Sequence, residues 1–178
     1  YNNTVIKVEK GFYDEYNYIK FDLLENIYNL VQKYNTYNIF ITGHSSGAAM
    51  ATLMTYDIIT IYRNYTMFGL IQFGSPRVGN KEFIKDFNKY SILSYRITHY
   101  YDMVPHIPEE FLGYRHISNE IWYNENNSIY KICDNLNNTE DNSCSNSCSP
   151  LHCTSTSDHL NYINITMGRD EESSCYLF

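Results

Sequence analysis

A serine between two glycines is the residue of this chain whose setting most directly predicts chemistry. Ser45 lies within Gly43-His44-Ser45-Ser46-Gly47, after the apolar run at 38–42 and before a long helix-like stretch at 47–62. A serine hydroxyl is a weak nucleophile, and an enzyme that uses one exposes its oxygen on a sharp turn from a strand to a helix. Glycines two positions away favour that turn, because side chains there would collide where strand and helix approach. The pattern predicts a nucleophilic serine, and a glycine-bracketed turn without chemistry is the alternative.

A nucleophilic serine needs a histidine that takes its proton and a carboxylate that orients the histidine. In hydrolases with this turn they follow in the order Ser, Asp or Glu, His. Asp102 comes just after an expected strand at 93–99, so its carboxylate should lie at the same rim as Ser45. His159 stands between a polar loop and an apolar segment that would anchor it, and we prefer it to His152. The sequence predicts these three residues as a catalytic triad, against a turn-forming aspartate and a surface histidine.

The residues on either side of the serine have separate expected roles. Ser46 would begin the helix, and its backbone N–H would help hold the negative charge on the oxygen of the attacked carbonyl. His44 is tied to the turn and is expected to point elsewhere. The predicted chemistry is hydrolysis through an acyl-enzyme on the serine, and its steps need no metal or cofactor.

The spacing of the apolar residues predicts the elements that must position these side chains. Weak alternation predicts an edge strand at 5–8, and apolar residues three and four apart predict a helix over 12–34 that packs one face on a sheet. The residues of that face are Phe12, Tyr16, Ile19, Leu23, Ile27, Leu30, Val31 and Tyr34. Buried strands are expected at 38–42, 67–73 and 93–99, helices at 47–62 and 80–90 with Phe83 and Phe87 inward, and a hairpin at 120–123 and 129–133. Strands that alternate with helices indicate an α/β fold with a mostly parallel sheet, whose ligands bind at the carboxyl ends of the strands.

Length and charge limit the classes of function. A chain of 178 residues fits one domain over 1–178, and it shows no internal repeat or separable linker. The formal net charge of −7 and the lack of a Lys/Arg cluster argue against nucleic acid or an anionic membrane surface as a standing partner. Apolar runs stay well below the roughly 18 residues that a membrane-spanning helix needs, so no transmembrane segment is expected.

Five cysteines follow residue 132, in sequence rich in serine, asparagine and aspartate that includes the long polar loop 134–157. Disulfides usually hold such loops and form in oxidising compartments, so we expect the protein outside the cell or in the secretory pathway. Glycosylation motifs support this weakly, since about three would arise by chance in a chain so rich in asparagine. They begin at Asn2, Asn64, Asn126, Asn137 and Asn164. Cys175, far from the other cysteines, is the expected unpaired one. A zinc site is a less favoured alternative, with candidate ligands Cys144, Cys148, Cys153, His152 and His159.

Five blocks of sequence, in order over nearly the whole chain, resemble the class 3 (fungal-type) lipases. They are Val-Glu-Lys-Gly-Phe at 8–12, Gly-His-Ser-Ser-Gly-Ala at 43–48, Phe-Gly-Ser-Pro-Arg-Val-Gly-Asn at 73–80, Arg-Ile-Thr-His with Asp-Met-Val-Pro at 96–105, and Asp-His-Leu-Asn-Tyr at 158–162. The resemblance implies an α/β-hydrolase fold with Ser45 as nucleophile, His159 as base and Asp102 as its orienter. It also implies a lipid ester as substrate, transient contact with a lipid interface, and a disulfide between Cys133 and Cys144.

The chain also departs from that family. Glu9 stands where histidine is usual, Ser46 where leucine is common and Ala48 where a second glycine is frequent, and none of these removes a catalytic atom. In the family, the strand and loop with the second oxyanion donor and the lid precede the first block, so the chain is expected to correspond to the C-terminal two-thirds of a lipase. Loss of one oxyanion donor typically costs about 100- to 1000-fold in rate. The alternative function is therefore a catalytically impaired, lipase-like fragment that acts as a binding or structural module. A peptidase or thioesterase on the same scaffold is a third hypothesis.

Overall fold

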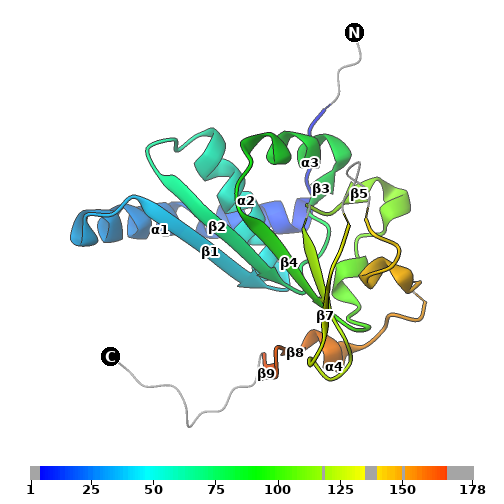
Figure 1. Cartoon of the computed structure of the whole chain (residues 1–178). Helices are drawn as coiled ribbons and strands as arrows, with labels where there is room; N and C mark the ends of the chain where they lie inside the picture. Colours follow the sequence, from blue (N-terminus) through cyan, green and yellow to red (C-terminus); the bar gives the residue numbers. More distant parts are fainter. Residues whose placement is uncertain (1–4, 118, 135–139, 150, 168–178) are drawn as a thin grey trace.

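A five-stranded sheet forms the centre of the molecule. The computed structural model describes residues 5–117, 119–134, 140–149 and 151–167. The strands lie in the order β1-β2-β4-β6-β7 (Figure 1). Their bounds are β1 Asn38–His44, β2 Thr66–Phe73, β4 Ser94–His99, β6 Glu120–Tyr123 and β7 Tyr130–Ile132. The first four are parallel, and β7 pairs with β6 antiparallel. This confirms the predicted α/β fold with a mostly parallel sheet, and the predicted hairpin.

The parallel strands bring distant segments of the chain to one rim. His44 at the end of β1 lies opposite Phe73 at the end of β2, and His99 at the end of β4 lies opposite Tyr123 at the end of β6. The segments that follow these strands therefore meet at the rim where ligands bind in folds of this kind.

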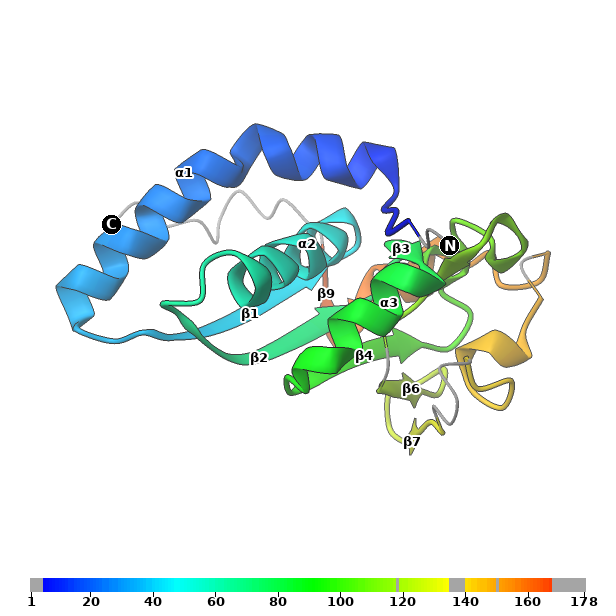
Figure 2. The same cartoon turned by 90° about the horizontal axis from the view of Figure 1, so that it is seen from above.

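Helices cover the sheet in layers. α2 (Ser46–Thr60) packs on β1 and β2, and α1 (Lys10–Tyr34) packs on α2 (Figure 2). α3 (Lys81–Phe87) continues into a 3-10 turn over 88–90, and its Phe83 and Phe87 are each 1% exposed, as predicted. The apolar core lies between these helices and the sheet.

The prediction of an edge strand at 5–8 is wrong. Val8 forms one isolated antiparallel bridge with Gly79, and α1 begins at Lys10. The carboxylate of Glu9 accepts a hydrogen bond from the N–H of Phe12 at 2.9 Å. It thereby satisfies one of the N–H groups that lack a partner at the start of a helix. Glu9, one of the departures from the resembled family, is the N-cap of α1.

The predicted core face of α1 is only partly correct. Tyr16 and Val31 are buried, whereas Leu23, Leu30 and Tyr34 are 37%, 52% and 62% exposed. α1 packs on α2 more than on the sheet, and its C-terminal end extends past α2 (Figure 2). A periodicity of 3.6 residues shows which side chains share a helix face, but it does not show how much of that face a neighbour covers.

Short elements surround the C-terminal part of the sheet. β3 (Gly79–Asn80) pairs with β5 (Tyr114–Arg115), and β8 (Asn161–Tyr162) pairs with β9 (Ile165–Thr166). The one-turn helices are α4 (Thr156–His159) and the 3-10 turns at 104–106, 110–112 and 145–147. Within the described ranges, no helix combines the length and apolar character needed to cross a membrane.

Two disulfides hold the described part of the cysteine-rich segment. Cys133 pairs with Cys144, as the family resemblance implies, and Cys148 pairs with Cys153. Because these bonds use the sulfur atoms that the zinc alternative requires, they leave it without thiolate ligands. Outside the described residues lie Cys175 and the motifs at Asn2 and Asn137.

Candidate active site

Ser45 lies at the turn from β1 to α2, in a backbone conformation that is rare for residues other than glycine. Its φ is 57° and its ψ is −130°, a strained combination that persists only when the surroundings enforce it. Its N–H donates to the carbonyl oxygen of Phe73 at 3.0 Å, and its own carbonyl accepts from the N–H groups of Ala48 and Ala49. These bonds fix the turn and hold the serine side chain at the rim of the sheet.

The two glycines around Ser45 have different reasons to be there. A Cβ at Gly43 would lie 2.4 Å from the carbonyl oxygen of Gly47, because the backbones of strand and helix touch at this point. A Cβ at Gly47 would meet nothing within 4 Å among the described residues. The steric reason predicted for both glycines is correct for Gly43 and wrong for Gly47, which borders an open groove beside α1.

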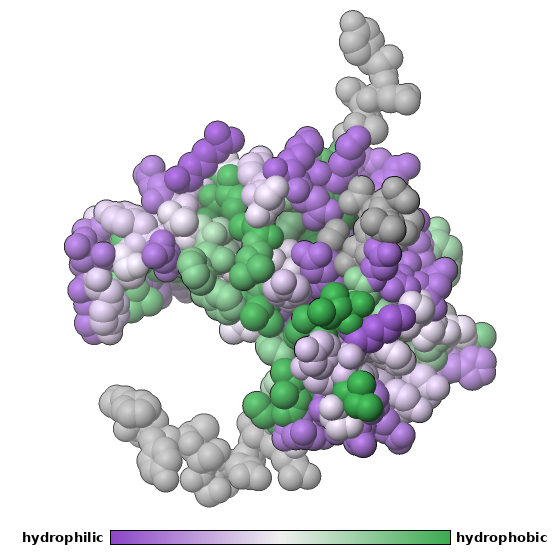
Figure 3. All heavy atoms as spheres, viewed as in Figure 1, coloured by the Kyte–Doolittle hydropathy of each residue, from purple (hydrophilic) through white to green (hydrophobic). Residues whose placement is uncertain are grey.

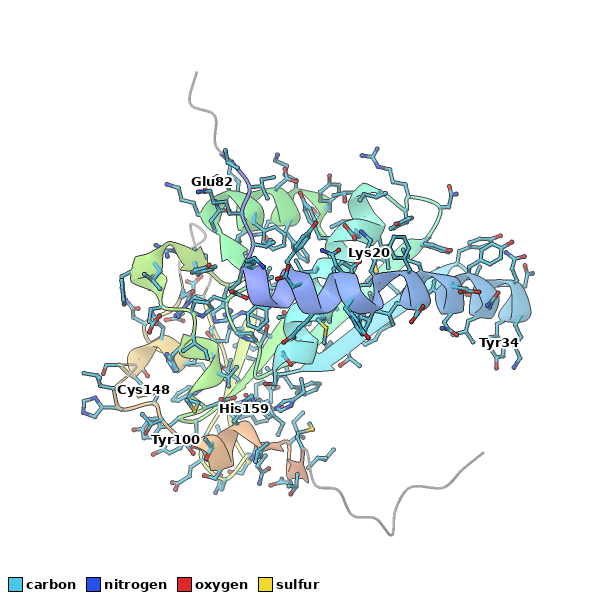
Figure 4. All side chains as sticks on the ribbon, turned by 180° about the vertical axis from the view of Figure 1, so that it is seen from behind. Lys20, Tyr34, Glu82, Tyr100, Cys148 and His159 are labelled. Carbon is cyan, nitrogen blue, oxygen red and sulfur yellow. A yellow bond between two sulfur atoms is a disulfide. The ribbon has the colours of Figure 1, made fainter. Side chains whose placement is uncertain are left out.

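The imidazole of His159 joins Ser45 to Asp102. Its Nε2 lies 2.8 Å from Ser45 Oγ, and its Nδ1 lies 3.0 Å from each carboxylate oxygen of Asp102. The three side chains come from the β1–α2 turn, the loop after β4 and the end of α4, and Figure 4 shows His159 on the side of α4 that faces the sheet. The Asp102 side chain is 1% exposed and that of His159 is 13% exposed. His152, the alternative base, is exposed and contacts Ser149 instead.

The carboxylate of Asp102 has further partners besides His159. It accepts hydrogen bonds from the hydroxyl of Tyr162 and from the N–H of Val104. Burial first, and then the nearby carboxylate, raise the pKa of Tyr162 well above its ordinary value, so the hydroxyl stays protonated and donates a hydrogen bond to Asp102. Gly74 has a φ of 53°, and a Cβ there would lie 2.8 Å from Asp102 Oδ2. Sequence reasoning missed both neighbours; their signals are a tyrosine three positions after the histidine and a glycine directly after β2.

The expectation that His44 points elsewhere is wrong. Its ring stacks on that of His159, with ring centroids 4.5 Å apart and 29° between the planes. Its Nε2 lies 2.8 Å from the carbonyl oxygen of His159. Burial has the largest effect on the pKa of His44 and lowers it, which favours the neutral ring. His44 therefore packs against the histidine of the site and contacts its backbone.

Ser46 is the first residue of α2, a helix of 15 residues. The first N–H groups of a helix have no intrahelical acceptor and carry the positive end of the helix dipole. They therefore suit an oxygen that becomes negatively charged beside Ser45. This is the position that the sequence predicts for an oxyanion donor.

One group of candidate metal ligands comes together among the described residues, namely Glu120, Cys133 and Cys144. The two sulfur atoms are bonded to each other, and Glu120 accepts a hydrogen bond from Thr98 and pairs with Arg96. These contacts occupy the ligand atoms, so the group does not fit a metal ion.

The parallel sheet, the strained serine turn and the helix that follows it define an α/β-hydrolase. The chain belongs to the class 3 lipase family, because the model of the family described as "Lipase (class 3)" matches residues 1–112.

Relatives and solved structures agree with this assignment. A lipase from Rhizomucor miehei is 33% identical over 165 residues, which are 91% of this chain and 44% of that protein. The secreted mono- and diacylglycerol lipase A of Penicillium cyclopium is 32% identical over 120 residues, 67% of this chain and 38% of that protein. A solved triacylglycerol lipase, whose catalytic centre is formed by a serine protease triad, matches with a TM-score of 0.81 and 31% identity over 94% of this chain and 63% of that one. The chain thus spans less than half the length of these curated relatives.

Proposed function

We propose that this chain carries the catalytic centre of a serine esterase of the lipase type, which hydrolyses carboxylic ester bonds of lipids such as triacylglycerols. The observation that carries the proposal is the position of His159, whose two ring nitrogens contact Ser45 Oγ and the Asp102 carboxylate. Membership in the class 3 lipase family supports a lipid ester as the substrate class.

The first half of the reaction forms an acyl-enzyme. Ser45 Oγ attacks the carbonyl carbon of the ester while His159 Nε2 takes the hydroxyl proton. The N–H of Ser46 donates to the oxyanion that forms, and Asp102 accepts from Nδ1, which keeps the histidine in the useful tautomer and stabilises the imidazolium. His159 then gives its proton to the alcohol oxygen, the C–O bond breaks, and the acyl group stays on Ser45.

The second half of the reaction releases the acid. A water molecule gives a proton to His159 and attacks the acyl carbonyl, and the oxyanion again lies beside the first N–H of α2. When this intermediate collapses, the bond to Ser45 Oγ breaks and His159 returns the proton to that oxygen. Each step uses only side chains of this chain, one backbone N–H and water.

We also propose that the protein works outside the cell. Two disulfides lie among the described residues, and disulfides persist in oxidising compartments. The Penicillium relative is a secreted lipase. Contact with a lipid interface would be transient on this proposal.

The esterase proposal is tested by removing the serine hydroxyl. Ser45→Ala should lower ester turnover by about a million-fold in a competent enzyme, because the nucleophile is lost. A fluorophosphonate probe should label the parent chain at Ser45, as located by peptide mass mapping, and should not label the variant. Ser147→Ala, at an exposed serine of the cysteine-rich segment, serves as the control and should keep both activity and labelling.

Other outcomes would favour the other hypotheses. A folded chain that does not react with the probe would indicate a catalytically impaired, lipase-like module that binds or supports a partner. Cleavage of amides or thioesters without cleavage of oxygen esters would indicate a peptidase or thioesterase.

A further inference from the structure

We propose that His99 and Asn127 act together as positioning residues for the segment that carries His159. This segment, residues 156–166, consists of α4, β8 and β9 and is called here the base segment. The proposal rests on the esterase function proposed above and adds two residues that contact neither Ser45 nor Asp102 through their side chains.

A continuous set of contacts joins the two residues to the base segment. His99 at the end of β4 has its Nδ1 3.0 Å from the carbonyl oxygen of Asp158. Its Nε2 lies 3.1 Å from Nδ2 of Asn127, in the turn between β6 and β7. Oδ1 of Asn127 accepts a hydrogen bond from the N–H of Ile163 at 3.1 Å. The pair therefore contacts the base segment both before and after His159.

The base segment needs such contacts because it is short and strained. It contains a helix of one turn and two strands of two residues each. Between those strands, Ile163 and Asn164 have φ values of 52° and 61°, and positive φ is unfavourable for a β-branched residue such as isoleucine. The N–H of Ile163 is the group that donates a hydrogen bond to Asn127. The side chain of Asn127 therefore holds the backbone at its most strained point.

The orientation of the Asn127 amide selects the tautomer of His99. Because Oδ1 accepts a hydrogen bond from the N–H of Ile163, Nδ2 faces His99 Nε2 and donates a hydrogen bond to it. The ring hydrogen of His99 then lies on Nδ1, which donates a hydrogen bond to the carbonyl oxygen of Asp158. The carbonyl oxygen of Glu125 also lies 3.0 Å from Nε2. A ring with its hydrogen on Nε2 would donate to Glu125 and leave the Asp158 carbonyl without this donor. Asn127 thus favours the tautomer that holds the base segment.

Substitution by glycine tests the role of the Asn127 side chain without adding strain to the backbone. Asn127 has a φ of 55°, which glycine adopts freely, so Asn127→Gly removes only the side-chain contacts. We expect kcat for a soluble ester to fall about 10- to 100-fold with KM unchanged, because His159 loses its alignment while substrate binding does not change. Asn35→Gly, at an exposed residue with a φ of 49° after α1, is the matched control and should keep the parent kcat.

Hydrogen exchange and NMR measure the contacts independently of turnover. In Asn127→Gly the amide of Ile163 should exchange at least about ten times faster than in the parent and in Asn35→Gly, because it loses its acceptor. The ¹⁵N shifts of His99 should change from those of an Nδ1–H ring to those of a mixture of tautomers. If the parent chain does not react with the fluorophosphonate, the esterase proposal fails, and these two measurements still decide whether the contacts hold the base segment.

A double variant tests whether the two residues act as one unit. If they do, His99→Gln combined with Asn127→Gly should be no slower than the slower single variant, since each change alone already breaks the set of contacts. Rate losses that multiply in the double variant would overturn the proposal. So would an Asn127→Gly chain with the parent kcat, unchanged exchange at Ile163, or a loss of rate explained by a smaller folded fraction.

Discussion

The β1 side and the β6 side of the sheet are covered differently. On the β1 side, within the described residues, one edge of β1 pairs with β2 and the other edge has no partner strand. A groove of about 230 Å³ beside it is lined by residues of α1, β1 and α2, most of them apolar. Phe40 and Phe68 are 49% and 64% exposed, and Figure 3 shows hydrophobic side chains gathered over β1 and β2 on the visible face.

On the β6 side, charged side chains are buried and paired. Arg96 on β4 lies 3.5 Å from Glu120 on β6, and both are almost fully buried. Arg77 contacts both carboxylate oxygens of Glu140, at 2.9 and 2.7 Å. Buried ion pairs of this kind hold their elements in one arrangement, since any displacement leaves a charge without a partner in a medium of low dielectric constant.

The site lies where the two sides meet, and its members divide between them. Ser45 follows β1, whereas Asp102 and His159 belong to the segments around β4 and β8. Asp102 and His159 therefore have buried, polar neighbours, and Ser45, the proposed nucleophile, borders an apolar, open surface. Exposed apolar surface and unpaired strand edges favour association with other molecules, so we expect the two sides to respond differently to substitution.

The sharpest test of the comparison is to remove one phenylalanine from a buried position and one from the open side. Phe87→Ala should lower the free energy of unfolding by about 3–5 kcal/mol, because the side chain is 1% exposed and its loss leaves a cavity. Phe68→Ala, at 64% exposure, should change it by less than about 0.5 kcal/mol. Urea unfolding measures both. Equal losses would show that the β1 side is as well packed as the core.

A smaller loss of stability is expected when the buried ion pair between Arg77 and Glu140 is broken. Burial alone would raise the pKa of Glu140, but His116 and the bidentate Arg77 lower it to about 2. Since this folded-state pKa lies below the ordinary value of 4.5, Glu140 stabilises the fold above pH 4.5, and that contribution is lost as the pH falls toward about 2. Glu140→Gln should cost about 3 kcal/mol at neutral pH, because Arg77 stays buried without its counter-charge.

Unfolding measured against pH checks this prediction. The parent chain should lose more stability between pH 4.5 and 2 than Glu140→Gln does, because the variant has already lost this contribution. Asp14→Ala, which removes one partner of the exposed pair with Lys10, is the control and should change the stability much less, because solvent screens the pair. If Glu140→Gln had the stability and pH dependence of the parent, the claim that buried ion pairs stabilise the β6 side would be wrong.

The two sides also differ in how well the sequence predicts them. The strands, α2 and the hairpin follow from local periodicity, because each buries a regular pattern of side chains against a neighbour. The positions of Ser45 and Asp102 just after β1 and β4 also follow from the sequence, since the carboxyl ends of parallel strands meet at one rim. His159 lies at the end of α4, a one-turn helix that the periodicity does not predict. The exposed end of α1 could not be predicted in this way, because exposure depends on what lies against the helix.

The immediate surroundings of the site were harder to predict for another reason. The ring of His44 stacks on His159, and Tyr162 reaches Asp102, through approaches between segments more than 50 residues apart in the chain. No local pattern records such approaches. Glu9 shows the same limit at the start of α1, where residues that alternate like a strand instead precede a helix cap.

The smallest of these effects concerns Tyr162, at the meeting point of the two sides. Tyr162→Phe removes the hydroxyl that donates to the buried Asp102 carboxylate, and a hydrogen bond to a charged group contributes about 1.5–3 kcal/mol. If that bond orients the carboxylate toward His159, kcat should fall about 10- to 100-fold while KM stays constant.

Tyr56→Phe is the matched control, because Tyr56 also donates to a carboxylate, that of Asp86 at 2.6 Å, away from the site. It should lower stability slightly and leave kcat unchanged. If both variants lost stability alike and neither lost kcat, the hydroxyl of Tyr162 would serve the packing of the polar side and not the alignment of Asp102. If only Tyr162→Phe lost kcat, the buried polar side would act directly on Asp102 and His159, because the two tyrosines differ in which carboxylate accepts their hydrogen bond.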